Sequence, residues 1–392
     1  MLNSQVSPWP CFTKEEAAAV ERVLLSNRVN YWTGTEGRDF EKEFAAWVGA
    51  RHAVALANGT VALDLALKAL DIGPGDEVIV TPRTFLASVS CVVTAGATPV
   101  FADVDRDSGN LTAQTISAAV TPKTKAVICV HLAGWPCDMD PIMTLAQDHG
   151  FFVIEDCAQA HGARYKGRSV GSIGHIAAWS FCQDKIMTTG GEGGMVTTND
   201  ADLWSRMWSY KDHGKSWAVV YEREHPPGFR WLHESFGTNW RMTEMQAAIG
   251  RIQLERMPNW HSARLKNAER IWECARALPG LRVPPIPDWA EHAAYKCYVF
   301  VEPDQLADGW DRDRIAAEVQ ALGVPCMQGS CSEVYLEKAF DGSGWRPEPR
   351  LAVAKELGET SLMFLVHPTL TEEHVDRTCE AISKVMHAAS GG

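Results

Sequence analysis

The sequence predicts a doubly wound α/β fold, in which mostly parallel strands are covered by helices on both faces. From residue 51 onwards, short apolar runs alternate with longer amphipathic runs, and Gly or Pro stands at most junctions. The apolar runs at 78–80 and 152–154 are continuous, as expected for strands that are buried on both faces. Residues with a function should then gather at the carboxyl ends of these strands.

The individual elements follow from local patterns. Thr13, with Glu16 three residues later, has the spacing of a capping box and predicts a helix at 13–26. The alternation then predicts strands at 52–57, 77–82, 98–104, 125–134 and 151–156, and helices at 58–70, 84–96, 112–120 and 138–150. Further patterns predict strands at 176–181, 195–198 and 297–301, a long loop at 211–240, and helices at 201–210, 243–257, 259–278, 313–323 and from about 371. Thr243 and Gln246 are expected to cap the helix at 243–257.

Length and composition limit the class of protein. The 392 residues predict a large domain at 1–258 and a smaller C-terminal domain at 259–392, divided at Pro258, where a helix should end. The formal charge of −12 argues against binding to nucleic acid or to an anionic membrane. Neither a leader pattern nor a membrane-length apolar run is present, so we expect a cytoplasmic protein. The 11 scattered Cys indicate neither a disulfide framework nor a metal site.

One lysine, Lys185, stands between the strand-like runs at 176–181 and 195–198, in a turn with four glycines at 190–194. Glycines let the backbone approach a ligand closely, so the lysine beside them is a candidate reactive amine. The alternative is a hairpin whose lysine extends to solvent.

Two further positions at strand ends can bind charged groups. Asn58, Gly59 and Thr60 open a helix after the first strand of the alternation, so their amide groups and the Thr60 hydroxyl can hold an anion; the alternative is an ordinary helix cap. Asp156 ends the apolar run FFVIED, where we expect it to have a cationic partner; the alternative is an exposed strand-end residue. The chain lacks the G-x-G-x-x-G pattern at the helix start, which disfavours a dinucleotide fold.

An anion site, a strand-end carboxylate and a lysine in a glycine-rich turn together match the needs of pyridoxal 5′-phosphate. Lys185 would attach covalently to C4′ of the cofactor and Asp156 would keep its pyridine nitrogen protonated. The helix start at Asn58 would hold the phosphate.

Longer stretches resemble the sugar-nucleotide aminotransferases of the DegT type, a branch of the fold type I pyridoxal phosphate enzymes. The resemblance is carried, in this order, by ANGTVAL, TPRTFLASVSCVVTAGATPVFADVD, VHLAGWPCDMD, IEDCAQAHGARYKGRSVGSIG, SFCQDKIMTTGGEGG and NWRMTEMQAAIGRIQL. It implies a fold type I aminotransferase, with a mostly parallel, seven-stranded sheet in the large domain and a smaller C-terminal α+β domain.

The resemblance also implies further site residues. Phe85 is expected to stack on the pyridine ring, Gln159 to lie near its phenolic oxygen, and Ser180 to bind the phosphate. Asn239 is expected to reach the phosphate of the other subunit, which makes the active unit a homodimer with shared sites. From the residues alone, Phe85 could be a core aromatic, Gln159 a turn donor and Asn239 a loop amide.

The implied activity is the transfer of an amino group, from L-glutamate through pyridoxamine phosphate, to a keto carbon of a nucleotide-linked deoxysugar, with C4 favoured over C3. The product would serve a surface polysaccharide, such as lipopolysaccharide O-antigen, or an antibiotic. Cations should meet the diphosphate of the acceptor, and His213 should contact substrate. The candidates, each of which could also be an ordinary surface charge, are Arg83, Lys215, Arg230 and Arg241.

Two departures and two alternatives stand beside this hypothesis. The family commonly has a His and a Pro before the lysine, where this chain has Cys182, Gln183 and Asp184, and the segment 326–340 also differs from the commoner version. A pyridoxal-dependent sugar dehydratase is disfavoured, because those relatives carry His in place of Lys185. A cofactor-binding regulatory protein without turnover is the other alternative.

Overall fold

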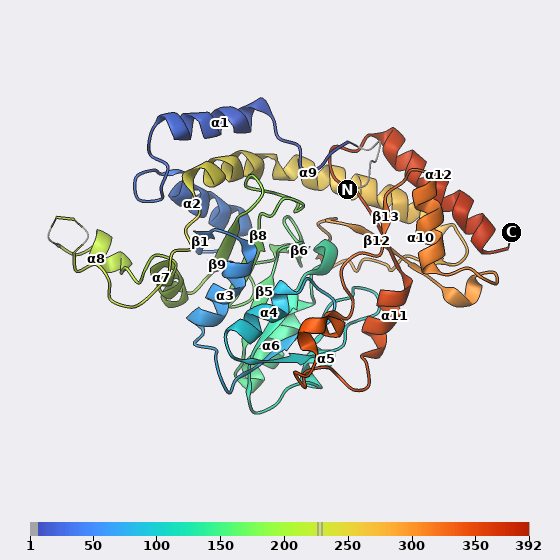
Figure 1. Cartoon of the computed structure of the whole chain (residues 1–392), viewed down its shortest axis with the longest axis horizontal. Coiled ribbons are helices and arrows are strands. Elements are labelled where there is room, and N and C mark those ends of the chain that lie inside the picture. The colour runs from blue at the N-terminus through green and yellow to red at the C-terminus, as the bar shows by residue number, and fades with distance from the viewer. Residues whose placement is uncertain (1–6, 226, 229, 392) are drawn as a thin grey trace.

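The computed structural model describes residues 7–225, 227–228 and 230–391. At its centre is a seven-stranded sheet in the order β1-β9-β8-β5-β4-β2-β3, in which β9 runs antiparallel to both of its neighbours and the other strands are parallel (Figure 1). The strands are β1 (His52–Leu56), β2 (Glu77–Val80), β3 (Thr98–Phe101), β4 (Thr124–Val130), β5 (Phe152–Asp156), β8 (Ile176–Ser180) and β9 (Gly194–Thr198). The predicted mostly parallel sheet is confirmed.

Successive side chains of the strands face two different cores, as a doubly wound sheet requires. In β2, Val78 and Val80 belong to a core that also contains residues of α3, α4 and α7, whereas Ile79 belongs to a core shared with α5 and α6. The helices are α1 (Lys14–Leu25), α2 (Glu36–Val48), α3 (Gly59–Ala69), α4 (Ala87–Thr94), α5 (Ala113–Ser117), α6 (Met139–His149), α7 (Ala201–Tyr210), α8 (Trp217–Tyr221), α9 (Glu244–Arg276), α10 (Arg312–Ala321), α11 (Ala352–Thr360) and α12 (Glu372–Ala389).

The C-terminal part carries a second, antiparallel sheet in the order β10-β12-β14-β13, which packs with the later half of α9 and with α12. Its strands are β10 (Leu281–Arg282), β12 (Cys297–Val301), β14 (Ser361–Phe364) and β13 (Cys326–Met327); a third small sheet joins β6 (Arg164–Tyr165), β7 (Arg168–Ser169) and β11 (Ala290–Glu291). Val334, Tyr335 and two residues of α11, Ala354 and Leu357, pack instead into the cores of the large sheet. The predicted domain division at 258/259 therefore stays a prediction.

The expected helix end at Pro258 is wrong. Helix α9 continues through this proline as one element of 33 residues, which runs along the upper edge of the molecule from α1 and α2 to α12 (Figure 1). A proline inside a helix costs about 3 kcal/mol because it removes one hydrogen bond and crowds the preceding turn. Leu254 and Met257 lie in the large-sheet core before the proline, and Ala268 and Ile271 lie in the C-terminal core after it. Burial on both sides of Pro258 outweighs its cost and keeps the helix continuous.

The first turn of α9 also fastens α2. The buried carboxylate of Glu244 accepts hydrogen bonds from the backbone amides of Glu36 at 2.6 Å and Gly37 at 3.1 Å. These two amides lie in the first turn of α2, where backbone N–H groups have no partner inside the helix. The capping boxes of Thr13 with Glu16 and of Thr243 with Gln246 are both present, as predicted.

We predict that Glu244→Gln lowers the free energy of unfolding by about 1–2 kcal/mol, because an amide has one carbonyl oxygen and leaves one buried N–H of α2 without an acceptor. Urea denaturation of the variant and of the native chain measures the difference. Glu255→Gln, at an exposed position of the same helix, is the matched control and should leave the midpoint unchanged. Equal loss in the two variants would contradict this role of Glu244.

Candidate active site

The parallel strands of the large sheet end at one edge, and most of the predicted site residues lie there. Asp156 is the last residue of β5 and Ser180 the last residue of β8. Phe85 follows β2, and Asn58 follows β1. Residues up to 122 positions apart in the sequence, from Asn58 to Ser180, are thus brought to the same edge because parallel strands share their carboxyl ends.

Asp156 is 5% exposed, and its partners in the chain are neutral. The hydroxyl of Ser88 donates to its Oδ2 at 2.7 Å, and the amide of Ala158 donates to its Oδ1 at 3.1 Å. Thr84 is hydrogen-bonded to Ser88 at 2.8 Å and so supports this contact from behind. No described residue forms an ion pair with Asp156, so the expected cationic partner is not supplied by the described part of the chain. A buried carboxylate without a cation is suited to a protonated ring nitrogen of a ligand.

The predicted anion site and Ser180 lie against each other. Asn58 is the N-cap of α3, where its side chain accepts the amide of Val61 at 3.0 Å, so the cap interpretation is also correct. A Cβ at Gly59 would lie 2.6 Å from Cβ of Ser180, and a Cβ at Gly194 would lie 2.3 Å from the carbonyl oxygen of Asn58. Glycine at both positions lets the helix start, the end of β8 and β9 meet at backbone contact, which places the Ser180 hydroxyl beside the open amides of α3.

Lys185 lies in the loop between β8 and β9, and its ammonium group is half-buried over the ring of Tyr295, 5.4 Å from the ring centroid. The Tyr295 hydroxyl donates to Oδ2 of Asp184 at 2.5 Å. Burial opposes the charge on Asp184, but Lys185, this hydroxyl and Lys296 outweigh it and lower the pKa of the Asp184 carboxyl. The indole of Trp9 donates to the carbonyl oxygen of Lys185 at 2.8 Å and fixes the backbone there. The lysine is therefore held by packing and is not a solvent-exposed hairpin residue.

Lys296 belongs to this group although its sequence context did not indicate it. Its ammonium lies over the same Tyr295 ring, 4.8 Å from the centroid. Burial lowers the pKa of Lys296 to about 8, and the neighbouring cations Arg264 and Lys185 act in the same direction, against the attraction of Asp184. Lys296 precedes a strand about 110 residues from Lys185 in the sequence, so only a pattern linking distant segments could have revealed the contact.

Phe85 and Gln159 both lie in loops that follow strands of the large sheet. The helix predicted at 84–96 begins only at Ala87, so Phe85 lies in the loop before it and is 70% exposed. The core-aromatic alternative is thereby excluded. Gln159 is 6% exposed, and its Oε1 accepts the amide of Ala133 at 2.8 Å, which leaves its NH₂ group to donate elsewhere.

The cations proposed for the diphosphate are not gathered on one open surface. Lys215 is buried and donates to Oδ1 of Asp212 at 2.9 Å, and Arg241 donates to the same oxygen at 2.7 Å. His213 and Arg230 are exposed on the same long loop, as is Asn239. Arg83 is 1% exposed and contacts Ser332 and Tyr298 of the C-terminal part of the chain, so it does not face solvent.

One buried group has the composition of a metal site. His131, Glu155 and Cys157 place one ligand atom each within 4.8 Å of one another. Nε2 of His131 lies 3.0 Å from Oε2 of Glu155, Nδ1 of His131 accepts the amide of Cys137, and Glu155 accepts three further backbone amides at 2.6–2.9 Å. Both the imidazole and the carboxylate are thus already engaged in hydrogen bonds. These hydrogen bonds connect the end of β4 and strand β5 with the loop before β8.

Fold and site together define a class. A seven-stranded sheet with one antiparallel strand, a strand-end carboxylate and a lysine after β8 are the architecture of fold type I aminotransferases. The model of the DegT/DnrJ/EryC1/StrS aminotransferase family matches residues 10–383, and the chain belongs to this family. The family and fold predicted from the sequence are confirmed.

Similar proteins carry related activities. GDP-perosamine synthase of Caulobacter vibrioides is 40% identical over 91% of this chain and 92% of that protein. UDP-N-acetyl-3-dehydro-α-D-glucosamine 3-aminotransferase of Acidithiobacillus ferrooxidans is 38% identical over 90% and 89%. An aminotransferase from Psychrobacter cryohalolentis, solved by X-ray crystallography, is 65% identical with a TM-score of 0.95 over 97% of this chain and 100% of that chain.

A protein of Streptococcus pneumoniae, described as a sugar aminotransferase, has been solved in a pyridoxal phosphate and a pyridoxamine phosphate form; the former is 25% identical with a TM-score of 0.85, over 98% of this chain and 99% of that chain. Among the described residues of the present chain, none of the helices has both the length and the apolar character that a membrane span needs.

We predict that Lys296→Met raises the free energy of unfolding at pH 7 by about 1–3 kcal/mol, because the charged amine has a folded-state pKa of about 8, below the unfolded value of about 10.4. Between about pH 8 and about pH 10.4 the folded native chain binds fewer protons than the unfolded chain. The loss of stability caused by the charged Lys296 is therefore complete below about pH 8 and disappears as the pH rises to about 10.4. Denaturation midpoints measured across pH 6–10.5 should show the gain of the variant shrinking over that window.

Lys42→Met, at a side chain that is 80% exposed, is the control and should show no gain at any pH. A Lys296→Met chain that is less stable than the native one, by an amount independent of pH, would contradict this prediction. It would mean that the aliphatic part of Lys296 packs favourably and that its buried charge does not destabilise the fold.

Proposed function

We propose that this aminotransferase uses pyridoxal 5′-phosphate to move an amino group from L-glutamate to the C4 keto carbon of a nucleotide-linked deoxysugar. The observation that carries the proposal is the convergence of Lys185, the cation-free Asp156 and the Gly59–Ser180 contact at one edge of the sheet. The names of the relatives support a nucleotide-linked sugar as the acceptor. A surface polysaccharide, including O-antigen, or an antibiotic is the proposed destination, in the cytoplasm.

The residues present fit the cofactor. The amides of Gly59 and Thr60 and the Ser180 hydroxyl would hold the phosphate. Asp156 would hold the protonated pyridine nitrogen, with Ser88 and Ala158 fixing the orientation of its carboxylate. When bound, the cofactor supplies an electron sink that makes the Cα proton of an amino acid removable.

Lys185 has two tasks in the proposed reaction. Its amine would hold the cofactor covalently and, once freed by the donor amine, would take the proton from the donor Cα and carry it for return. The same residue works in reverse when the ketosugar is the acceptor. Tyr295 supports the lysine from one side and Trp9 fixes its backbone, so the amine can move while its anchor stays in place.

The acceptor and its position of amination are the finer part of the proposal. Exposed Arg230 remains a candidate for contact with the diphosphate, and exposed His213 for contact with the substrate. One relative is named as a 3-aminotransferase, so the choice between C3 and C4 needs a direct experiment. The pure holoenzyme with glutamate should convert nucleotide-linked 4-ketosugars and not 3-ketosugars, as judged from product mass and the carbon that bears nitrogen.

We predict that Lys185→Ala abolishes transamination and leaves the fold intact, because the side chain is half-buried and is needed for covalent attachment and proton transfer. Borohydride should fix the cofactor to one peptide of the native chain, the one with Lys185, and to none in the variant. The Cys182→Ala chain, altered three residues away, serves as the control and should keep that linkage. Fixation of the cofactor at a single lysine of Lys185→Ala would show that another amine carries it.

The long loop also supports a proposed homodimer. Three of its aromatic side chains, Tyr221, Trp231 and Phe236, are 43%, 80% and 99% exposed, which is unusual unless another surface covers them. Asn239 lies exposed in the same loop. We propose that this loop meets a second copy of the chain and that Asn239 reaches the phosphate of that copy.

We predict that the inactive variants Lys185→Ala and Asn239→Asp restore activity when they are unfolded and refolded together. Asn239→Asp places a carboxylate against the phosphate, where like charges repel. A mixed dimer has one site with both lesions and one with neither, so roughly a quarter of native activity is expected if half of the dimers are mixed. Each variant refolded alone is the control. A mixture that stays inactive although mass measurement detects mixed dimers would place Asn239 in the site of its own subunit.

A further inference from the structure

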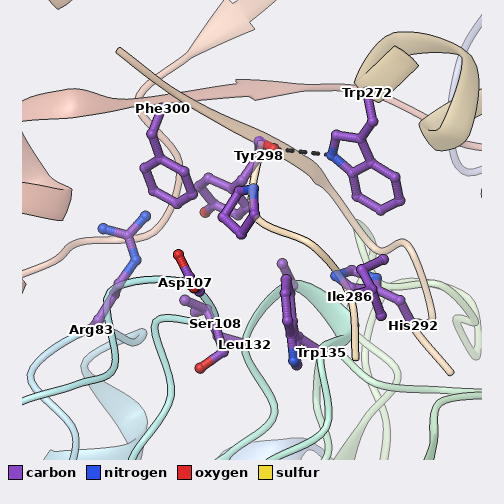
Figure 2. A pocket seen from close by; sticks show the side chains of 12 residues that line it. Arg83, Asp107, Ser108, Leu132, Trp135, Trp272, Ile286, His292, Tyr298 and Phe300 are labelled. Atoms are coloured by element: carbon purple, nitrogen blue, oxygen red, sulfur yellow. Dashed lines mark hydrogen bonds between the residues drawn. The ribbon is translucent and has the colours of Figure 1, made fainter. Parts of the chain in front are cut away.

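A small cavity lies between the loops of the large sheet and strand β12 of the small sheet (Figure 2). Its volume is about 30 Å³. Since roughly 10–15 Å³ of such space holds one water, it has room for about two oxygen-sized groups. Its lining combines aromatic side chains, including Trp135, Trp272 and Phe300, with a few polar ones, among them Arg83 and Asp107.

Arg83 lines this cavity and carries an uncompensated charge. Its side chain is 1% exposed, Nη1 donates to the Ser332 hydroxyl at 2.8 Å, and the guanidinium stacks on Tyr298 at 5.2 Å from the ring centroid. Nε and Nη2 are buried and have no hydrogen-bond partner among the described residues. Burial lowers the pKa of Arg83, although Tyr298 and Cys331 oppose this effect.

The two unpartnered nitrogens share one edge of the guanidinium. The N–H of Nε and one N–H of Nη2 point in the same direction, and two parallel donors match the two oxygens of a carboxylate. Ser332 occupies Nη1, so the side-on edge is the part that is left open.

The other polar residues of the cavity do not supply this partner. Asp107 lines the cavity, but its Oδ1 accepts from Arg282 at 2.6 Å and it forms no ion pair with Arg83. His292 is neutral at ordinary pH, because burial lowers its pKa to about 3, with His261 acting in the same direction. The Nδ1 atom of His292 accepts the amide of Ala294. Among the described residues, no carboxylate therefore forms an ion pair with Arg83, because Asp107 is engaged by Arg282.

The cavity adjoins the candidate active site. Ala133 forms part of its wall, and the amide of Ala133 donates to Gln159. Arg83 is followed by Thr84, whose hydroxyl is hydrogen-bonded to Ser88, the residue that donates to Asp156. The cavity is thus linked to Gln159 through Ala133, and to Asp156 through Thr84 and Ser88.

We propose that the Nε–Nη2 edge of Arg83 is a carboxylate-binding site, and that its occupant is either a free carboxylate ion or a carboxylate of the amino donor. Binding there neutralises a buried charge and joins the loop after β2 to strand β12. The donor alternative rests on the proposed function, whereas the site itself does not.

The test measures thermal unfolding of the holoenzyme in sodium formate and in sodium chloride at equal ionic strength. The native midpoint should rise with formate alone, on the order of 2 °C for each tenfold increase above its dissociation constant. Arg83→Lys, which keeps the charge and loses the two-donor edge, and Arg83→Met should both lose this rise. Arg312→Met is the matched control, since Arg312 is 8% exposed and its Nε and Nη1 already have acceptors, and it should keep the rise.

A crystal structure of the native holoenzyme grown in formate gives a second measurement that needs no variant to fold. Planar density across Nε and Nη2 of Arg83 is expected. Water or chloride at that edge, or a native midpoint that responds equally to both salts, would overturn the proposal.

The source of the carboxylate follows from the half-reaction with glutamate, monitored through the absorbance of the cofactor. If the donor uses the site, formate competes with glutamate, and Arg83→Lys raises the half-saturating glutamate concentration about tenfold or more. Formate that binds without competing identifies a free ion with a structural role. A native enzyme that glutamate never converts would count against the proposed donor and leave the formate result standing.

Discussion

The site depends on the contact between the start of α3 and the ends of β8 and β9. Gly59 meets Ser180, and Gly194 meets the carbonyl of Asn58, at distances that no Cβ could share. This contact directs the open amides of α3 and the Ser180 hydroxyl to one point at the carboxyl edge of the sheet. A larger side chain at either glycine would push the helix away from the strand, and the separate polar groups would no longer form one anion site.

Two buried side chains near this edge, Asp156 and Arg83, have no ion-pair partner among the described residues, and their charges are opposite. Asp156 is a buried anion whose hydrogen-bond donors are neutral, and Arg83 is a buried cation with an open edge. Isolated charges in such positions are costly, so a stable protein keeps them where a ligand compensates them. A protonated ring nitrogen at Asp156 and a carboxylate at Arg83 would do so from opposite sides of the loop that joins β2 to α4.

Local patterns were reliable where a short stretch of chain decides its own conformation. The capping boxes at Thr13 and Thr243 and the continuous apolar strands formed as the sequence indicated, because their partners lie within a few residues or within the sheet. Pro258 shows where such reasoning ends: a local helix breaker was overruled by burial of the same helix in two cores. Lys215 is a second example. Its charge suggested contact with a diphosphate, but the fold of the long loop buries it against Asp212.

The sequence by itself determined the class of fold, the place of the candidate lysine between two strands, and the positions of Asp156 and Asn58–Thr60 at strand ends, because periodicity and glycine placement constrain the backbone locally. The tertiary structure alone decided that Phe85 is exposed, that Lys296 shares the Tyr295 ring with Lys185, and that Arg83 is enclosed between two sheets. These contacts join segments more than 100 residues apart, or depend on which neighbour covers a loop. Burial and charge pairing of that kind are properties of the packed chain, and no local pattern encodes them.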